Sequence, residues 1–284
     1  MLRLRVLSAA VLVPLFLGLI LVGQPWVTVI VAALSVIVAA EVARLFQGAG
    51  FPVERVIVLV SAPLAVLGLP WLGERVGIAA GFAGAVLVVS AIAAFRRSEP
   101  RDGFMAWIAT SFAALYASLL AFVPAIVAVA PNIPPDSPLA RVLDAGGSWL
   151  LILVLTVWSF DTAAYLAGRT LKRGRFLNHI SPQKTWSGVI GGTIAAVAVS
   201  AILVVAAGQH VLGGVLLGLV VAVAAQAGDV AESLLKRAAG AKDSGTLIPG
   251  HGGLLDRVDS FLFAAPAMYI CLTWIQLLAV ASPA

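Results

Sequence analysis

Apolar stretches long enough to cross a bilayer recur along the whole chain, with short polar intervals between them. A spanning helix needs about 20 predominantly apolar residues, and most of these stretches are close to that length. They cover residues 6–23, 26–46, 56–72, 76–95, 104–130, 148–168, 187–207, 211–227 and 260–280. The pattern predicts an all-α, polytopic integral membrane protein with about nine transmembrane helices. The stretch 104–130 is long for one span and contains Pro124, so we expect it to tilt, kink or break into a span and a surface segment.

The composition agrees with a membrane protein. Hydrophobic residues make up 61% of the chain and charged residues 11%, whereas a soluble domain carries about 25% charged residues. Because no polar interval is long enough for a soluble domain, we expect one membrane domain, with amino-terminal helices in residues 1–130 and carboxy-terminal helices in 131–284. Cys271 is the only cysteine, which excludes an intrachain disulfide and a cysteine metal site.

Lysine and arginine concentrate in alternate intervals. If the amino terminus is cytoplasmic, 16 of the 18 basic residues fall on the inner side, and only Arg75 and Arg141 fall outside. Short loops rich in Lys and Arg stay in the cytoplasm, so the distribution predicts nine spans in the cell's inner membrane. The formal net charge is +5, and the basic residues that carry it lie in loops beside the membrane, where anionic lipid headgroups attract them. With no nucleic-acid-binding module in the sequence, nucleic acid is excluded as a partner.

The polar interval 228–259 concentrates the side chains suited to chemistry. Asp229, Ser233 and Lys236 are three to four residues apart, so a helix would place them on one face, with Glu232 beside them. A solvated surface helix would show the same spacing. The continuation is more informative, because a glycine turn is followed by two acids, Asp256 and Asp259, that share a face in the first turn of the next helix. The other candidate residues of the interval are Arg237, Lys242, Asp243, His251, Gly252, Gly253 and Arg257.

Two acids of this interval suggest a metal site. Asp229 on one helix and Asp256 on the next could hold Mg²⁺, which keeps several waters and takes substrate phosphates as its other ligands. Such a site suits a nucleoside triphosphate, and we expect Asp259 to support it. His251 has no second histidine at metal-ligand spacing, so we expect it to donate to a phosphate or to shape the turn. The sequence contains no P-loop and no dinucleotide-binding motif, which disfavours those folds.

Asp161 is a further candidate, because it lies well inside an apolar stretch where an unpaired carboxylate is costly. It belongs either to a helix-packing hydrogen bond or to a site at the cytoplasmic mouth. The following basic loop ends with Ser181, Lys184 and Thr185, whose donors could hold a phosphate at the start of the next span. A basic loop can also serve topology alone. For both Asp161 and the basic loop, a structural role and a role in a site stay open.

Two other features predict packing. Glu41 is followed three residues later by Arg44, which is typical of an ion pair near a helix end, although an acid inside an apolar stretch can also touch a substrate. Small residues four apart allow close helix contacts within one chain or between two, so a homodimer stays open. The glycine pairs are Gly77 with Gly81, Gly188 with Gly192, and Gly214 with Gly218.

The polar interval resembles the characteristic motif of the phosphatidate cytidylyltransferase family, also called CDP-diacylglycerol synthases. The motif reads Ser233-x-x-Lys236-Arg237-x4-Lys242-Asp243-x5-Pro249-x-His251-Gly252-Gly253-x-x-Asp256-Arg257-x-Asp259. The segments Asp161-Thr162-x-Ala164-Tyr165 and Ser181-Pro182-x-Lys184-Thr185-Trp186 are also similar to the family. Gln183 and Ser187 depart from it, where the family tends to carry a second lysine and a glutamate.

The resemblance implies transfer of the cytidylyl group of CTP to phosphatidic acid, giving CDP-diacylglycerol and pyrophosphate with the help of Mg²⁺. A phosphate monoester is largely ionised at pH 7, so the attack needs no strong protein base. Asp229 and Asp256 would then bind the metal. Phosphates would be bound by Lys236, Arg237, Lys242 and Arg257, and a substrate by Asp161, Ser181, Lys184, Thr185, Ser233, Gly252 and Gly253.

Two other functions remain open. A CTP-dependent polyprenol kinase would also need Mg²⁺ and a basic cytoplasmic mouth, but it would release CDP in place of pyrophosphate. A secondary transporter could use Asp161 and the boundary acids as an ion path, but it would not explain the basic glycine-histidine turn. The pattern of a CDP-alcohol phosphotransferase is not found in the sequence.

Overall fold

The computed structural model describes residues 14, 16–68, 76–247 and 252–281. Over these residues the chain is helical and contains no strand, and Arg175 and Thr185 form an isolated antiparallel bridge. The all-α prediction is therefore confirmed. The helices are α2 (Trp26–Gly48), α3 (Arg55–Gly68), α4 (Val76–Ala94), α5 (Pro100–Ser118), α6 (Phe122–Ala128), α7 (Ala145–Leu171), α8 (Trp186–Ala206), α9 (Val211–Ala238) and α10 (Leu255–Ala281).

Five helical segments of the described chain are long and apolar enough to cross a membrane, which makes this a multi-pass membrane protein. They are α2, the segment 100–128, α7, α8 and α9. The stretches 56–72 and 76–95 give shorter apolar helices over the described residues, and most of the first predicted span, 6–23, lies outside them. The prediction of a polytopic membrane protein is therefore confirmed, and five of its about nine expected helices are found as long apolar spans in the described residues.

The expected break near Pro124 is present. The helix over 104–130 divides into α5 and α6, which are joined by the 3-10 turn Leu119–Ala121. Proline has no N–H, so Pro124 cannot donate to the carbonyl of Leu120 four residues earlier, and the regular ladder is lost at this point.

The chain forms two compact units. Unit 1 comprises residues 1–125 and 234–258, and unit 2 comprises residues 126–233 and 259–284. The division falls inside α9 and α10, so the end of α9, the loop that follows it and the start of α10 group with the amino-terminal helices. The polar interval 228–259 thus contributes residues to both units.

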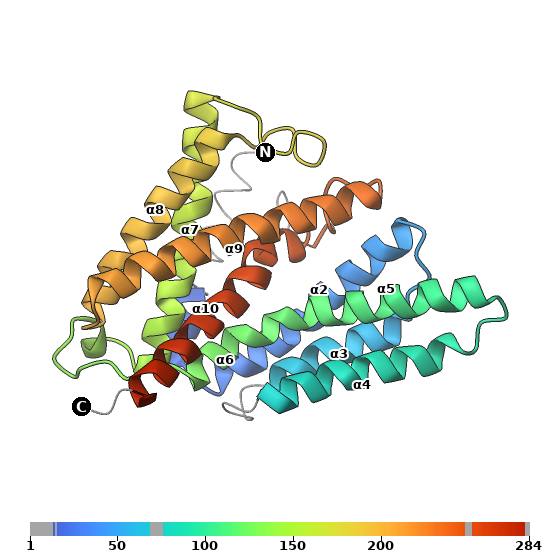
Figure 1. The fold of residues 1–284 in the computed structure, drawn as a ribbon, viewed down its shortest axis with the longest axis horizontal. Helices are drawn as coiled ribbons and strands as arrows, with labels where there is room; N and C mark the ends of the chain where they lie inside the picture. Colours follow the sequence, from blue (N-terminus) through green and yellow to red (C-terminus); the bar gives the residue numbers. More distant parts are fainter. Residues whose placement is uncertain (1–13, 15, 69–75, 248–251, 282–284) are drawn as a thin grey trace. The chain divides into compact units, whose positions relative to one another are not determined.

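Unit 1 packs α2 to α5 through small side chains (Figure 1). Val38 and Val42 of α2 and Ala113 and Ala117 of α5 are completely buried. Alanine and valine let helix axes approach closely, since little side-chain volume lies between the backbones. The resulting core is apolar. The carboxylate of Glu41 on α2 is buried in this core, which is unusual for a charged group and is described below.

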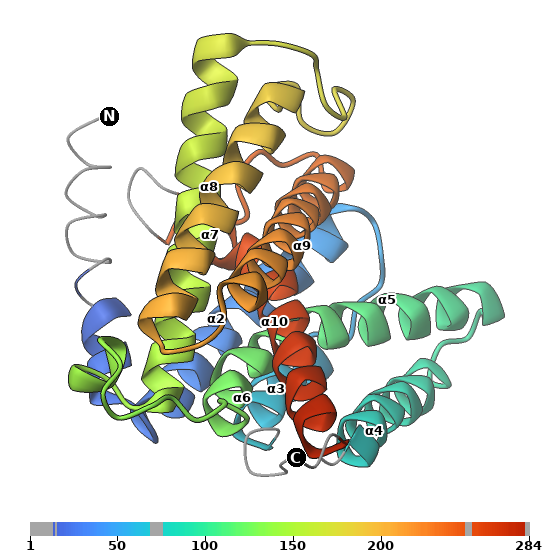
Figure 2. The ribbon, with the colours of Figure 1, turned by 60° about the vertical axis from the view of Figure 1, so that its left-hand side comes forward.

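Unit 2 packs α8 against α7 and against α9 (Figures 1 and 2). A side chain at Gly188 would collide with the backbone of Ala164 on α7, and one at Gly218 with the backbone of Val197 on α8. The predicted role of these glycines in packing is therefore confirmed, and their contacts join helices of the same chain.

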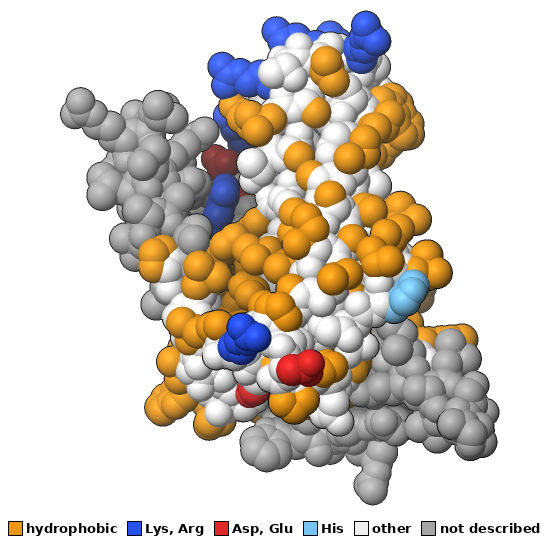
Figure 3. Space-filling view, turned by 90° about the vertical axis from the view of Figure 1, so that its left-hand side faces the viewer, with side chains coloured by type: hydrophobic (Ala, Val, Ile, Leu, Met, Phe, Trp, Pro, Cys, Tyr) orange, Lys and Arg blue, Asp and Glu red, His pale blue; other side chains and the backbone are white. Residues whose placement is uncertain are grey.

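The exposed side of unit 2 suits a bilayer. Ile190, Ile194 and Ile202 of α8 are more than half exposed and recur at helical spacing on one face. Figure 3 shows apolar side chains over much of this face and Lys and Arg side chains gathered at one end. In the last turn of α7 and the loop after it, Arg169, Lys172, Arg173 and Arg175 are exposed.

Candidate active site

Three carboxylates of unit 2 form an acidic cluster, which we define as Asp229, Glu232 and Asp259. Asp229 and Glu232 are one turn apart on α9, and Asp259 comes from the start of α10. One carboxylate oxygen from each residue lies within 4.8 Å of the others. Glu232 is completely buried, whereas Asp229 and Asp259 are partly exposed. Three negative charges this close repel one another, so the arrangement favours a bound cation.

A fourth acid adjoins the cluster. Asp161 on α7 accepts a hydrogen bond of 3.4 Å from the hydroxyl of Ser260, and its charge interacts with that of Asp259. Asp161 therefore takes part in a hydrogen bond between helices, which was one prediction for it. It also lies beside the acidic cluster, as expected from the other prediction, that it belongs to a site. Its exposed side chain remains accessible to a ligand.

Lys184 supplies positive charge to the acidic cluster. Its Nζ lies 2.7 Å from Oδ2 of Asp229, and the lysine side chain is only 15% exposed. The loop that carries it is anchored at both ends, since Phe176 packs edge-on against Trp186 with ring centroids 4.7 Å apart. The Thr185 hydroxyl caps α8 by accepting from the N–H of Gly188 at 3.1 Å. The loop therefore holds Lys184 at the start of α8, and its expected role in binding a phosphate stays a prediction.

The two departures from the family motif lie in this loop. The hydroxyl of Ser187 accepts from the N–H of Arg173 at 3.3 Å and lies 3.1 Å from the Thr185 hydroxyl. Ser187 thus helps to close the loop onto α8. The neighbouring Gln183 is exposed, and nothing in the structure explains its identity.

The close approach of α9 to α10 depends on Gly228, next to Asp229. A Cβ at this position would overlap the backbone carbonyl of Asp259. Gly228→Ala should therefore push Asp259 away from the acidic cluster and lower activity about tenfold or more, since small misplacements at a reacting centre are costly. The measurement is product formation per folded protein.

Gly213→Ala is the matched control for this variant, because it lies on the same helix and its added Cβ meets nothing within 4 Å. Alanine favours helix by about 1 kcal/mol over glycine, so this control should be neutral or stabilising. Equal activity of the two variants would contradict the proposed packing requirement.

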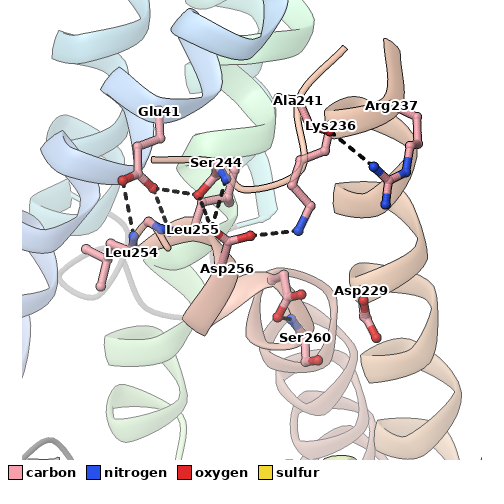
Figure 4. Close-up of polar contacts among 12 residues, drawn as sticks. Glu41, Asp229, Lys236, Arg237, Ala241, Ser244, Leu254, Leu255, Asp256 and Ser260 are labelled. Carbon is pink, nitrogen blue, oxygen red and sulfur yellow. Dashed lines mark hydrogen bonds and ion pairs between the residues drawn. The ribbon is translucent and has the colours of Figure 1, made fainter. Parts of the chain in front are cut away.

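Asp256 lies in unit 1, in a network of its own. Its Oδ1 accepts from Lys236 Nζ at 2.6 Å, and its Oδ2 accepts from the N–H of Ser244 at 2.9 Å, the hydroxyl of Ser244 at 2.8 Å and the N–H of Gly253 at 2.8 Å. We call these four residues the Asp256 network (Figure 4). Both carboxylate oxygens are therefore engaged by protein donors.

The network keeps Asp256 ionised. Asp256 precedes the apolar run 260–280. Burial opposes its ionisation, but the Lys236 ammonium and the backbone N–H groups of Gly253 and Ser244 outweigh burial and lower the pKa of Asp256 from 3.8 to about 2. The stability that the ionised carboxylate contributes is thus present above pH 4 and is lost only as the pH falls towards 2.

Asp229 and Asp256, the two residues predicted to bind one metal ion, belong to different groups, the acidic cluster and the Asp256 network. Asp229 belongs to unit 2 and Asp256 to unit 1, and the acids whose oxygens gather around that of Asp229 are Glu232 and Asp259. Asp256 instead holds Lys236 and the glycine turn. Gly252 in that turn has a φ of +80°, a conformation that L side chains rarely adopt.

The remaining predicted residues are distributed along the same segments. Ser233 is buried on α9, and Arg237 donates to the carbonyl of Ala241 at 3.3 Å. Lys242, Asp243 and Arg257 are exposed, and Ser181 is partly exposed in the basic loop. His251 lies outside the described residues, so its expected role stays a prediction.

Sequence reasoning missed three residues of these groups: Glu232 as a member of the acidic cluster, and Glu41 and Ser244 as anchors of the Asp256 network. Glu232 could have been found from its spacing to Asp229, one helical turn away. For Glu41 the signal was a carboxylate inside an apolar stretch. Its carboxylate binds the start of α10 as well as Arg44, whose Nη2 is 3.8 Å away.

Comparison of the sequence with known proteins shows the family of the chain. The sequence profile of the Cytidylyltransferase family matches residues 3–275. The chain belongs to this family. The motif quoted above contains Lys236, Gly253 and Asp256 of the Asp256 network in unit 1 and Asp259 of the acidic cluster in unit 2.

Individual relatives agree with the family. The phosphatidate cytidylyltransferase of Mycobacterium bovis is 32% identical over 279 residues, which cover 95% of this chain and 89% of that protein. The Brucella suis enzyme of the same name is 48% identical over 128 residues, or 44% of this chain and 47% of that protein. The one from Haemophilus influenzae is 38% identical over 123 residues, 41% of this chain and 43% of that protein. The matches to the Brucella and Haemophilus relatives span less than half of their length.

Proposed function

We propose that this protein transfers the cytidylyl group of CTP to phosphatidic acid and releases pyrophosphate, giving CDP-diacylglycerol for phospholipid biosynthesis. The observation that carries the proposal is the similarity over 95% of the chain to a phosphatidate cytidylyltransferase. The acidic cluster at the end of an apolar helix supports it, because a lipid phosphate and a nucleotide must meet at a membrane surface.

The reaction joins two phosphates. An oxygen of the phosphatidic acid phosphate attacks the α-phosphorus of CTP, and a new P–O bond forms. The bond from the α-phosphorus to the oxygen bridging to the β-phosphate breaks, and pyrophosphate leaves with that electron pair. Because the attacking phosphate is already ionised at pH 7, the protein has to position the phosphates and offset their charge. We propose Lys184, whose ammonium lies beside Asp229, for this role, and the exposed Lys242 and Arg257 are accessible to a phosphate.

The acidic cluster fits a divalent cation. Carboxylate oxygens are the ligands that Mg²⁺ prefers, and Asp229, Glu232 and Asp259 each offer one within a shared space. We therefore propose these residues as the Mg²⁺ ligands, and Asp256 as the residue that holds the glycine turn of unit 1. The bound ion would neutralise charge on the triphosphate. We place the site on the cytoplasmic face of the inner membrane, because most Lys and Arg residues fall in intervals of one side.

Lys184→Met tests the phosphate role of the basic loop. Loss of a charged donor typically costs about 1.5–3 kcal/mol, so we expect kcat/KM to fall on the order of 10- to 100-fold. Initial rates at varied CTP and varied phosphatidic acid identify the substrate whose KM changes. Lys172→Met, an exposed lysine of the same loop, is the control, and an equal loss in both variants would contradict a specific role for Lys184.

The proposed function is tested with purified protein in detergent, Mg²⁺, phosphatidic acid and CTP labelled in the cytosine. Label in the lipid phase together with released pyrophosphate is the expected result. Formation of CDP without labelled lipid would favour a kinase, and folded protein that leaves CTP unchanged would overturn the proposal.

A further inference from the structure

Glu41 is a buried acid that the proposed reaction does not use. It lies on α2 inside an apolar stretch, and its side chain is 0% exposed. Its Oε1 accepts from the N–H of Leu254 at 3.1 Å, and its Oε2 accepts from the N–H of Leu255 at 2.7 Å and contacts the Ser244 hydroxyl at 3.1 Å. Figure 4 shows these contacts from α2 to the beginning of α10. All the residues involved belong to unit 1.

The backbone around Glu41 leaves room for this carboxylate. A Cβ at Gly253 would lie 2.6 Å from both carboxylate oxygens, and a Cβ at Gly245 would lie 2.5 Å from Oε1. A side chain at either position would therefore displace the carboxylate. The segments 244–245 and 253–255 are thus shaped around an acid from a distant helix.

Glu41 and Asp256 divide the donors of these segments between them. Gly253 donates its N–H to Asp256, whereas Leu254 and Leu255 donate theirs to Glu41. A neutral Ser or Thr at the N-cap is enough to cap a helix, so capping alone does not require a carboxylate buried at high desolvation cost. The arrangement instead holds three consecutive N–H groups and the start of α10 in one position.

Ser244 links the two acids directly. Its hydroxyl lies 3.1 Å from Glu41 Oε2 and 2.8 Å from Asp256 Oδ2. A serine hydroxyl carries one hydrogen and can donate it to one acceptor at a time. The position of the Glu41 carboxylate therefore influences the hydrogen bond that orients Asp256, and through Asp256 the ammonium of Lys236.

We propose that Glu41 is a positioning residue for cytidylyl transfer, which orients Asp256 and Lys236 by anchoring the segments 244–245 and 253–255. The inference rests on the proposed function. Glutamine at this position would keep the shape, but it would present an N–H₂ donor to a backbone N–H or to Ser244, so these segments would have to shift.

Two variants test the role of Glu41, with one control. Glu41→Gln changes the anchor itself, and Ser244→Ala removes the link while keeping both backbone bonds to Glu41. Ser35→Ala is the matched control, because Ser35 is equally buried on α2 and its hydroxyl bonds only the carbonyl of Ala32 in its own helix. For each variant we would measure kcat and KM per folded protein and the amide hydrogen exchange of residues 252–258.

We expect Glu41→Gln to lower kcat about 10- to 100-fold and to speed exchange of the Leu254 and Leu255 amides. Ser244→Ala should lower kcat less, and in the double variant the two effects should be less than additive, because both act on Asp256. Ser35→Ala should change neither quantity.

Wild-type kcat and unchanged exchange in Glu41→Gln would overturn the inference, as would a loss explained by the folded fraction alone. If Glu41→Gln does not fold, normal kcat in Ser244→Ala overturns it. If the wild-type protein makes no CDP-diacylglycerol, the proposed function fails, and the amide exchange still decides whether Glu41 anchors these segments.

Discussion

Asp229→Asn is expected to lower turnover on the order of 10²- to 10³-fold, the largest effect we predict for a single residue. Asparagine keeps the size of the side chain but removes the negative charge that lies beside Glu232 and Asp259. It also removes the ion pair with Lys184. The measurement is the rate of labelled CDP-diacylglycerol formation over a Mg²⁺ titration. Either the rate should be low at every Mg²⁺ concentration, or a much higher Mg²⁺ concentration should be needed to reach half of the maximal rate.

A second measurement separates metal binding from catalysis. Binding of Mn²⁺ alone, followed by electron paramagnetic resonance, should weaken in Asp229→Asn and in Glu232→Gln. Asp136→Asn, an exposed acid in the loop before α7, is the control and should bind Mn²⁺ and turn over like the wild type. Unchanged Mn²⁺ affinity in both cluster variants would contradict the assignment of the acidic cluster to the cation.

Asp256→Asn is expected to reduce both stability and turnover. The side chains of Asp256 and Lys236 are 6% and 13% exposed, and breaking a buried ion pair by removing one charge typically costs about 3–5 kcal/mol. The asparagine side chain has a single oxygen with which to accept, so either Lys236 or the donors of Ser244 and Gly253 would lose their acceptor. The thermal midpoint in detergent and the activity per folded protein measure the two effects separately.

A double-mutant cycle tests the pairing itself. Lys236→Met together with Asp256→Asn should cost less stability than the sum of the single variants, because the double variant leaves no uncompensated buried charge. Asp102→Asn is the matched control, since Asp102 is also an acid in the first turn of a helix but is exposed. Additive losses in the cycle would show that Lys236 and Asp256 stabilise the protein independently.

Hydropathy predicted the helices well where the apolar pattern is long. The stretches 26–46, 148–168 and 187–207 correspond to α2, α7 and α8, and Pro124 marks the break between α5 and α6. These features are local, because a helix satisfies its backbone within one segment and proline acts on its own turn. The stretches 56–72 and 76–95 likewise correspond to α3 and α4 over the described residues.

The site was predicted in outline. Helical spacing correctly placed Asp229, Ser233 and Lys236 on α9 and put Asp256 and Asp259 at the start of α10. The assignment of Asp229 and Asp256 to one metal remains untested, and the structure favours Glu232 and Asp259 as the partners of Asp229. Spacing along a helix cannot distinguish these partners, because it says which residues share a face and not which face of another helix lies opposite.

The sequence alone determined the class of protein, the helical positions and the motif, because hydrophobicity and the 3.6-residue period are properties of consecutive residues. The tertiary structure decided which charges meet. Glu41 reaches the backbone of Leu254 and Leu255, and Lys184 reaches Asp229, across long separations in the chain. Such contacts depend on how the helices pack, and packing is set by close approaches such as that of Gly228 to the backbone of Asp259, which no local pattern encodes.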